Sequence, residues 1–274
     1  MSHRLEALDL LYKEVAQTGS ITVGNVEYKS AQKRVQNAYK ELQEARKDFL
    51  RMDLARFYRI AIFGSARFDG GDEEFQFVRD LSCSLVKEVR IEEVGIDIVT
   101  GGGPGVMRAA HEGTLFAINE AKENGHTIKS KNLGINIDLP NTEDANGLAH
   151  ISTTHEDFPP RLQEFLDKTR AAYNAPGGVG TLLELAMVLQ LRQVGHLEKD
   201  YPIIAHPAWL PLIEAWNNEM YHKRFARERK LLISEDDLNL IQISDHIADI
   251  IQPIKTSHAK WYLDLRSKLV RQED

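Results

Sequence analysis

The sequence predicts an α/β fold in which a doubly wound, mostly parallel sheet carries helices on both faces. Three observations predict it. Short apolar runs alternate with stretches of helical periodicity, glycine-rich turns follow three of those runs, and residues 1–56 differ in composition from the rest. Strands that alternate with helices form βαβ units, and such units build parallel sheets covered on both sides. The predicted domains are a helical N-terminal extension over residues 1–56 and an α/β domain over residues 57–274.

Composition and charge exclude several classes of protein. The chain has 274 residues, 42% of them hydrophobic and 27% charged, and a net charge of −7, as in an ordinary globular protein. We expect no membrane span, since no run of about 18 apolar residues is present, and no signal peptide. The single cysteine favours a reducing, cytoplasmic setting. The acidic balance argues against nucleic acid as a partner.

The N-terminal extension predicts a long helix. Residues 30–57 are rich in Lys, Glu, Gln, Ala and Arg, which are good helix formers. An apolar stripe with the spacing of a heptad repeat consists of Val35, Ala38, Leu42, Ala45, Phe49 and Met52. This helix either docks on the core of the same chain or forms a dimer with a second copy, and both interpretations stay open.

From residue 57 onward the pattern alternates. The first apolar run, residues 59–63, ends in Gly64-Ser65 and predicts a buried strand entering a turn. Helical spacing of Phe77, Leu81 and Leu85 follows it. The later runs predict strands at residues 96–100, 133–139, 151–154, 171–174, 203–205 and 240–243. The intervening periodicity predicts helices at residues 73–93, 106–124, 160–168, 181–194, 209–225, 245–251 and 258–270.

The glycine-rich turns predict a ligand site. Gly64-Ser65, residues 101–105 and residues 177–180 each follow a predicted strand, and ligands of such sheets bind beyond the carboxyl ends of the strands. The segment PGGVGT, residues 176–181, leads directly into a helix. Its backbone N–H groups and the Thr181 hydroxyl could hold a phosphate. The alternative is a tight turn in which the glycines only supply positive φ angles.

Two common nucleotide motifs are absent. The P-loop pattern G-x-x-x-x-G-K-[ST] does not occur in the chain. The dinucleotide pattern G-x-G-x-x-G fails because its third position is Val106 when counted from Gly101 and Arg108 when counted from Gly103. The glycine turns therefore suit a small nucleotide with one phosphate.

Glu184 has two interpretations. It follows Thr181 by three residues, which is the spacing of a helix capping box. It would also place a carboxylate at the mouth of the predicted pocket, beside a bound phosphate. A carboxylate there suits a ligand that develops positive charge, such as the oxocarbenium-like C1′ of a ribose.

The motifs VTGGGPGVM (residues 99–107) and PGGVGTLLE (residues 176–184) resemble the signature pair of the LOG family. Its members are nucleoside 5′-monophosphate phosphoribohydrolases, first known for cytokinin activation and often labelled lysine decarboxylases. IFGSAR, residues 62–67, resembles the family's first strand and turn. The family also has an arginine upstream of the second motif, and Arg161 matches its place. The resemblance covers roughly residues 57–252.

The resemblance implies a Rossmann-like catalytic domain that hydrolyses a nucleoside 5′-monophosphate to free base and ribose 5-phosphate. It implies a homodimer with each site near the subunit interface, and neither a metal nor pyridoxal phosphate. Arg161 and Glu184 would be the catalytic pair, although Arg161 alone would also fit a surface salt bridge. The implied substrate-binding residues are Ser65, Gly102, Gly103, Met107, Gly177, Gly178, Gly180 and Thr181.

Two other functions stay open. The first is a non-catalytic nucleotide or molybdenum-cofactor binding or carrier protein. The second is a regulatory protein that senses a nucleotide through the N-terminal helix. Arg161 together with Glu184 favours the enzyme, because a protein that only binds phosphate gains nothing from a carboxylate beside it.

Overall fold

The computed structural model describes residues 22–23, 26–27, 36–42, 44–45, 53, 56–138 and 144–273. The chain divides into two units, Met1–Asp53 and Leu54–Asp274. In the first unit, β1 (Thr22–Val23) pairs antiparallel with β2 (Val26–Glu27), and residues 36–42 and 44–45 are helical. Val35, Phe49 and Met52 of the predicted apolar stripe lie outside the described residues, so the helix's role stays a prediction.

The second unit contains the predicted parallel sheet. Its seven strands lie in the order β6-β5-β4-β3-β7-β8-β9, and every neighbouring pair is parallel. The strands are β3 (Tyr58–Phe63), β4 (Ile96–Thr100), β5 (Asn132–Ile137), β6 (Ile151–His155), β7 (Ala171–Asn174), β8 (Ile203–Ala205) and β9 (Gln242–Ile243). The central strands β3, β4 and β7 are buried along their whole length, which explains why most of their residues are apolar.

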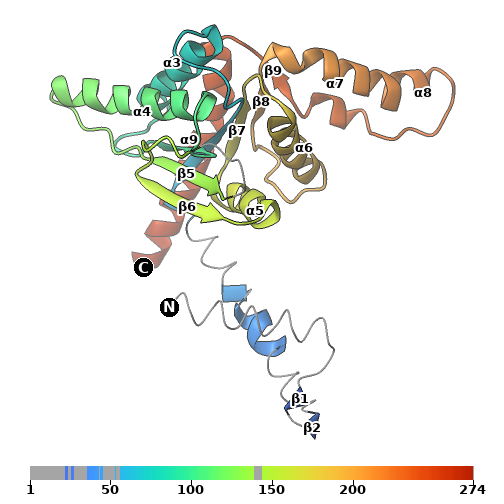
Figure 1. Ribbon diagram of the computed structural model, residues 1–274, viewed down its shortest axis with the longest axis horizontal. Coiled ribbons are helices and arrows are strands. Elements are labelled where there is room, and N and C mark those ends of the chain that lie inside the picture. Colours follow the sequence, from blue (N-terminus) through green and yellow to red (C-terminus); the bar gives the residue numbers. More distant parts are fainter. Residues whose placement is uncertain are drawn as a thin grey trace. The chain divides into compact units, whose positions relative to one another are not determined.

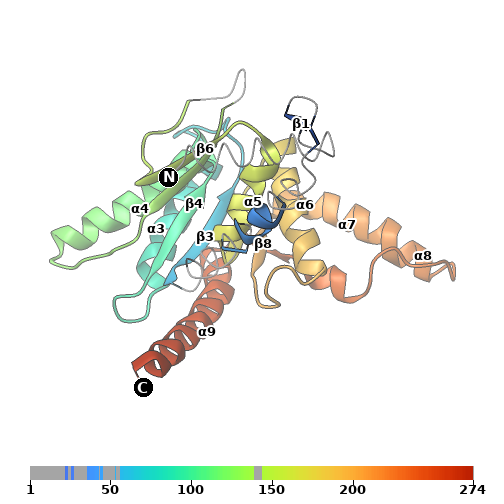
Figure 2. The ribbon, with the colours of Figure 1, turned by 90° about the horizontal axis from the view of Figure 1, so that it is seen from below.

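Helices cover both faces of this sheet, so the predicted α/β class is confirmed (Figures 1 and 2). One face packs against α3 (Glu73–Glu88), α4 (Val106–Glu123) and α9 (Ile247–Glu273). The other packs against α5 (Phe158–Lys168) and α6 (Val179–Gln193). Beyond β8 the chain continues through η1 (Pro207–Trp209), α7 (Leu210–Asn217), the π-helical η2 (Asn218–His222), α8 (Lys223–Phe225) and η3 (Asp236–Asn239). Within the described part of the chain, no helix is both long and apolar enough to span a membrane.

The C-terminal helix corrects one prediction. The sequence predicted separate helices at residues 245–251 and 258–270, but α9 is a single helix with Pro253 inside it. A proline cannot donate to the carbonyl four residues earlier, which here belongs to Asp249. The Gln242 side chain donates to that carbonyl at 3.1 Å. Ile250 and Ile254 are fully buried, so packing and this replacement bond carry the helix past the proline.

The strand order places the glycine turns together. From β3 the chain moves outward through β4, β5 and β6, and then returns to β7 on the other side of β3. In open α/β sheets, ligands bind at such a reversal, beyond the carboxyl ends of the strands. The three glycine segments follow β3, β4 and β7, which are adjacent strands. The predicted convergence at one edge is confirmed.

Candidate functional site

A cavity of about 770 Å³ opens where these three turns meet. We call it the glycine-loop cavity. The predicted residues that line it are Ser65, Met107, Arg161, Gly177, Gly178, Gly180, Thr181 and Glu184. Residues that sequence reasoning did not assign also line it, among them Gly101 and Arg67. The fold thus gathers the proposed catalytic pair and the glycine turns around one opening.

Gly102 and Gly103 are placed differently from the expectation. Both are buried, and neither is among the residues that line the cavity. The Asn146 backbone N–H donates to the Gly102 carbonyl at 2.7 Å, and the Asn146 side-chain amide donates to the Gly103 carbonyl at 2.8 Å. The connection between β5 and β6 therefore covers these two glycines. Gly101 faces the cavity in their place.

Gly101 is needed for close packing at the site. A Cβ there would lie 2.4 Å from Nη2 of Arg161 and 2.8 Å from Sδ of Met107. Any side chain at this position would displace the arginine. A run of three glycines in the sequence did not show which of them meets the cavity, because this depends on a contact with α5.

The turn from Gly177 into α6 has the features of an anion site. Gly178 is the N-cap of α6, without a side chain that caps the helix. The first helical bond runs from the Leu182 N–H to the Gly178 carbonyl at 3.0 Å, so the amides of Val179, Gly180 and Thr181 precede it. Residues 177–180 are exposed. Amides at this end of a helix attract negative charge.

The glycines of this turn have different reasons for being glycine. A Cβ on Gly177 would lie 2.2 Å from the Thr181 hydroxyl oxygen, so packing excludes one. A Cβ on Gly178 or Gly180 would meet nothing within 4 Å, and neither residue has a positive φ. The hypothesis that these glycines only serve the backbone conformation therefore fails for Gly178 and Gly180. Their lack of side chains leaves the helix end open.

The capping-box interpretation of Thr181 and Glu184 is wrong. Gly178 occupies the N-cap, so Thr181 lies in the third helical position and Glu184 one turn further on. Both side chains are buried, with Thr181 4% and Glu184 9% exposed. Glu184 lines the cavity instead of reaching back to a helix end.

Arg161 holds a fixed position beside Glu184. It comes from the first turns of α5, and only 7% of it is exposed. Its Nε donates to the Ile135 carbonyl at 2.9 Å, and its guanidinium carbon lies 5.1 Å from the centre of the Phe165 ring. Its Nη1 is 3.4 Å from Oε1 of Glu184. This is a buried ion pair, so the surface salt bridge that Arg161 could have formed is excluded.

Burial has the largest effect on the pKa of each residue in this pair. It raises the pKa of Glu184 to about 7, while the charge and hydrogen bond of Arg161 act in the opposite direction. Burial also lowers the pKa of Arg161, against the effect of Glu184. An arginine nevertheless keeps its charge in proteins. Glu184 is thus a carboxyl group that can gain or lose a proton near neutral pH, and such groups concentrate at functional sites.

Ser65 joins the three turns. Its backbone N–H donates to the Pro176 carbonyl at 3.1 Å, and its carbonyl accepts from the Val106 N–H at 2.9 Å. Its hydroxyl accepts from the Arg67 N–H at 3.1 Å. The first turn is therefore tied to the start of α4 and to the residue before Gly177. The predicted place of Ser65 near the nucleotide pocket agrees with this geometry, although its contact with a ligand stays a prediction.

Comparison with known proteins identifies a family. The model of the family described as "possible lysine decarboxylase" matches residues 107–254. No curated protein matches the chain. Similar solved structures include the molybdenum cofactor binding protein from the phototrophic bacterium Rippkaea orientalis, with 18% identity and a TM-score of 0.46 over 73% of this chain and 97% of that one. The molybdenum cofactor carrier protein from Chlamydomonas reinhardtii has 16% identity and a TM-score of 0.47 over 74% of this chain and 99% of that one.

The family match spans part of the site, since the first glycine turn and Gly101 precede it. It starts at Met107, on the rim of the glycine-loop cavity, and includes Arg161 and the whole PGGVGTLLE motif. Since it covers more than half of the chain, the chain belongs to the family described as "possible lysine decarboxylase", the LOG-family domain that its glycine motifs resemble.

Proposed function

We propose that the protein hydrolyses the N-glycosidic bond of a nucleoside 5′-monophosphate and releases the base and ribose 5-phosphate. The observation that carries the proposal is the position of Glu184. A buried carboxyl group lines the same cavity as the open amino end of α6, one helical turn from the amides that would hold a phosphate. The phosphate would dock at Gly177, Gly178, Gly180 and Thr181, and the ribose would then lie next to Glu184.

Glu184 and Arg161 would act on the ribose. Cleavage breaks the bond between C1′ and the base nitrogen and builds positive charge on the ribose, which an ionised carboxylate stabilises. Water adds to C1′, and its proton ends on the departing base. Glu184 can orient that water or take its proton for transfer. Arg161 keeps the carboxylate in place and presents its guanidinium donors to the ribose hydroxyls.

The principal alternative is a protein that binds a nucleotide or the phosphate of molybdenum cofactor without chemistry. Such a protein has no use for a carboxyl group buried next to its phosphate site, because like charges repel. Burying Glu184 and Arg161 also costs desolvation free energy, which their contact at 3.4 Å offsets only in part. The pair therefore favours the enzyme over the carrier.

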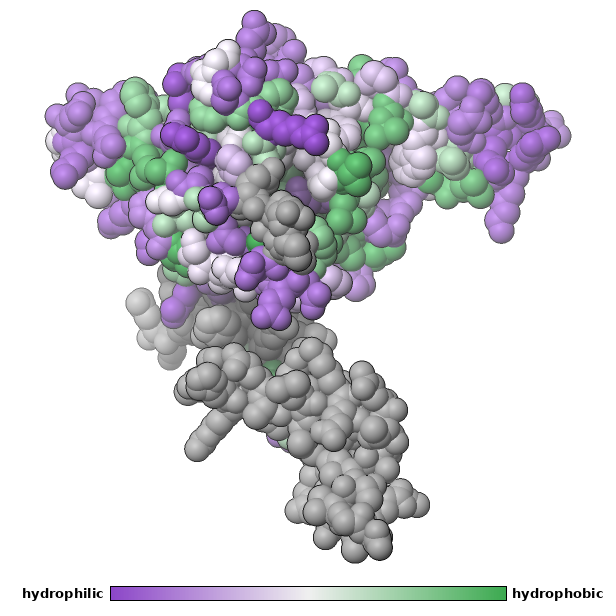
Figure 3. Space-filling model, in the orientation of Figure 1, coloured by the Kyte–Doolittle hydropathy of each residue, from purple (hydrophilic) through white to green (hydrophobic). Residues whose placement is uncertain are grey.

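We also propose that the protein forms a homodimer through the outer face of α6. This helix carries apolar residues on all sides, a pattern typical of buried helices. Yet Val179 is 84%, Leu183 43% and Leu182 38% exposed. Figure 3 shows a band of apolar residues over this region. Sedimentation should give the mass of a dimer, and Leu183→Glu should give monomers.

The test of the proposed activity is direct. The protein is incubated with AMP, GMP, CMP and UMP in turn, and free base is measured by chromatography. We expect release from at least one monophosphate, and its loss in Glu184→Ala with nucleotide binding retained. Glu112→Gln is the matched control, because Glu112 pairs with Arg108 on α4 and does not line the cavity. Binding without release of any base would favour the carrier.

A further inference from the structure

The charges around the glycine-loop cavity are unequal. Its described lining contains three charged side chains, Arg67, Arg161 and Glu184. Arg161 and Glu184 pair with each other, so their charges cancel whenever Glu184 is ionised. Arg67 then leaves the cavity with one uncompensated positive charge. A cavity with such an excess favours an anion over a neutral ligand of the same shape.

Arg67 has no structural task that would explain it. It is exposed, and its side chain forms no hydrogen bond or ion pair with the residues that the structure describes. Arg79 and Arg108 form ion pairs with Asp80 and Glu112. Arg90 and Arg192 lack a side-chain partner among the described residues, as Arg67 does, but neither of them lines the cavity. Arg67 is therefore free to contact a ligand.

The backbone brings Arg67 close to the amino end of α6. The Ser65 hydroxyl accepts from the Arg67 N–H at 3.1 Å, and the Ser65 N–H donates to the Pro176 carbonyl, also at 3.1 Å. Pro176 directly precedes the glycines that lead into the helix. Two hydrogen bonds thus connect the residue that carries the guanidinium with the turn that carries the open amides.

We propose that Arg67 binds the 5′-phosphate and makes the site selective for nucleotides over nucleosides, an inference that rests on the proposed function. A phosphate monoester carries nearly two negative charges at neutral pH. The end of a helix offers about half a positive charge, which is too little to balance it. The planar fork of an arginine supplies a full charge and two parallel hydrogen bonds to phosphate oxygens. The Arg161–Glu184 pair cannot supply this charge, because Glu184 neutralises Arg161 when it is ionised.

The experiment measures binding separately from turnover. The dissociation constants of AMP and adenosine, each in a form whose glycosidic nitrogen is replaced by carbon so that it cannot be cleaved, are measured by calorimetry with Glu184 intact and above pH 7, where Arg161 stays paired. Arg67 is kept as in the wild type or changed in Arg67→Ala and Arg67→Lys. We expect Arg67→Ala to weaken AMP binding on the order of 10- to 100-fold and to leave adenosine binding unchanged. Arg67→Lys should retain part of the affinity, since it keeps the charge without the fork. Arg108→Ala, an exposed arginine outside the cavity, should bind AMP like the parent.

The outcomes separate the two proposals. Equal AMP binding by Arg67→Ala and its parent would overturn the role of Arg67, even if the wild type releases bases. Equal loss of AMP and adenosine binding would also overturn it, since selectivity would not depend on this charge. If AMP binding depends on Arg67 but the wild type releases no base, the phosphate site stands and the hydrolase proposal fails. Thermal unfolding of each variant verifies that it is folded.

Discussion

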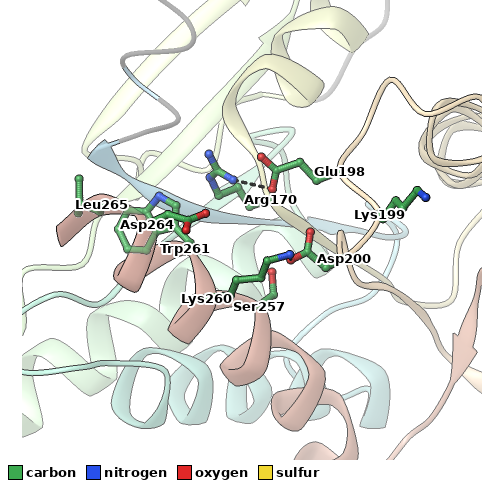
Figure 4. Close-up of a pocket in the computed structure, with 9 residues that line it drawn as sticks. All are labelled: Arg170, Glu198, Lys199, Asp200, Ser257, Lys260, Trp261, Asp264 and Leu265. Carbon is green, nitrogen blue, oxygen red and sulfur yellow. Dashed lines mark hydrogen bonds and ion pairs between the residues drawn. The ribbon is translucent and has the colours of Figure 1, made fainter. Parts of the chain in front are cut away.

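Two charged pockets lie at opposite ends of the strands of the sheet, and only one has the features of a ligand site. The second, of about 280 Å³, lies at the amino ends of β7 and β8 against α9 (Figure 4). We call it the paired-charge pocket. Its lining residues are Arg170, Glu198, Lys199, Asp200, Ser257, Lys260, Trp261, Asp264 and Leu265. It thus has twice as many charged side chains as the glycine-loop cavity.

The difference lies in how the charges are used. In the paired-charge pocket, Arg170 contacts Glu198 at 2.9 Å and Lys260 contacts Asp200 at 2.7 Å, and the lining holds equal numbers of positive and negative groups. In the glycine-loop cavity, a guanidinium and a helix end face the opening without a partner of opposite charge among the described residues. The number of charged residues therefore does not identify a site. The unpaired charge beside open backbone amides is the feature on which our proposal of a phosphate site rests.

The largest expected effect is a difference in activity between two isosteric variants, one in each pocket. Glu184→Gln should lower kcat for base release on the order of 1000-fold, because the amide cannot stabilise positive charge on the ribose. Glu198→Gln removes a carboxylate from the paired-charge pocket and should leave kcat within twofold, with a change in unfolding free energy below about 1 kcal/mol. Steady-state kinetics and thermal unfolding measure both. Similar losses of activity in the two variants would contradict the comparison.

The second effect concerns the partner of Glu184. Arg161→Ala should lower kcat on the order of 100-fold, since it removes the group that orients the carboxylate. It should also raise the pKa of Glu184 further, because Arg161 opposes the effect of burial on that group. Activity of this variant should therefore recover at higher pH than in the wild type. A pH profile that keeps its position would show that the two side chains are not coupled.

The third effect is the pH dependence of the wild type. Burial raises the pKa of Glu184 to about 7, and only the ionised form stabilises a cation. Activity should thus be full above this pH and should fall about tenfold for each pH unit below it. Measuring kcat at saturating nucleotide limits the contribution of the substrate phosphate, which titrates near pH 6. The residual activity of Glu184→Gln should lack this acidic limb.

The smallest effect distinguishes glycines that serve the fold from those that serve the ligand. Gly180→Ala adds a methyl group in open space and should stabilise the helix by about 0.5–1 kcal/mol. The same methyl group should raise KM about tenfold, as it narrows the approach of the phosphate to the amides. Gly177→Ala should instead destabilise the protein, because its Cβ meets Thr181. A Gly180→Ala variant with unchanged KM would place the phosphate elsewhere.

Much of the fold could be predicted from local patterns. The buried strands β3, β4 and β7 are mostly apolar segments followed by glycine turns, and their parallel arrangement follows from the helices between them. Local patterns failed at α9, where a proline predicts a break. The helix continues because the side chain of Gln242, which precedes α9 in the sequence, donates a hydrogen bond to the Asp249 carbonyl. Such a replacement bond has no sequence signal.

The site, like the fold, has features that local sequence patterns predict and features that depend on contacts between distant segments. The anion site at the start of α6 and the place of Glu184 could be predicted because glycines and an acidic residue occur at fixed spacing in one segment. The choice of Gly101 over Gly102 and Gly103 could not, since contacts with Arg161 and Asn146 from other segments decide it. The elevated pKa of Glu184 also arises from burial among several elements. Arg67 was visible in the IFGSAR motif, but only the structure shows that its charge is unpaired among the described residues.

The central claim is that a phosphate at the amino end of α6 brings the ribose C1′ to Glu184. A crystal structure of Glu184→Gln with uncleaved AMP tests it most directly. We expect phosphate oxygens on the amides of Val179 to Thr181 and on the Arg67 guanidinium, with C1′ about 3–4 Å from the side chain at position 184. AMP bound in the paired-charge pocket, or bound at α6 with C1′ out of reach of position 184, would contradict the account.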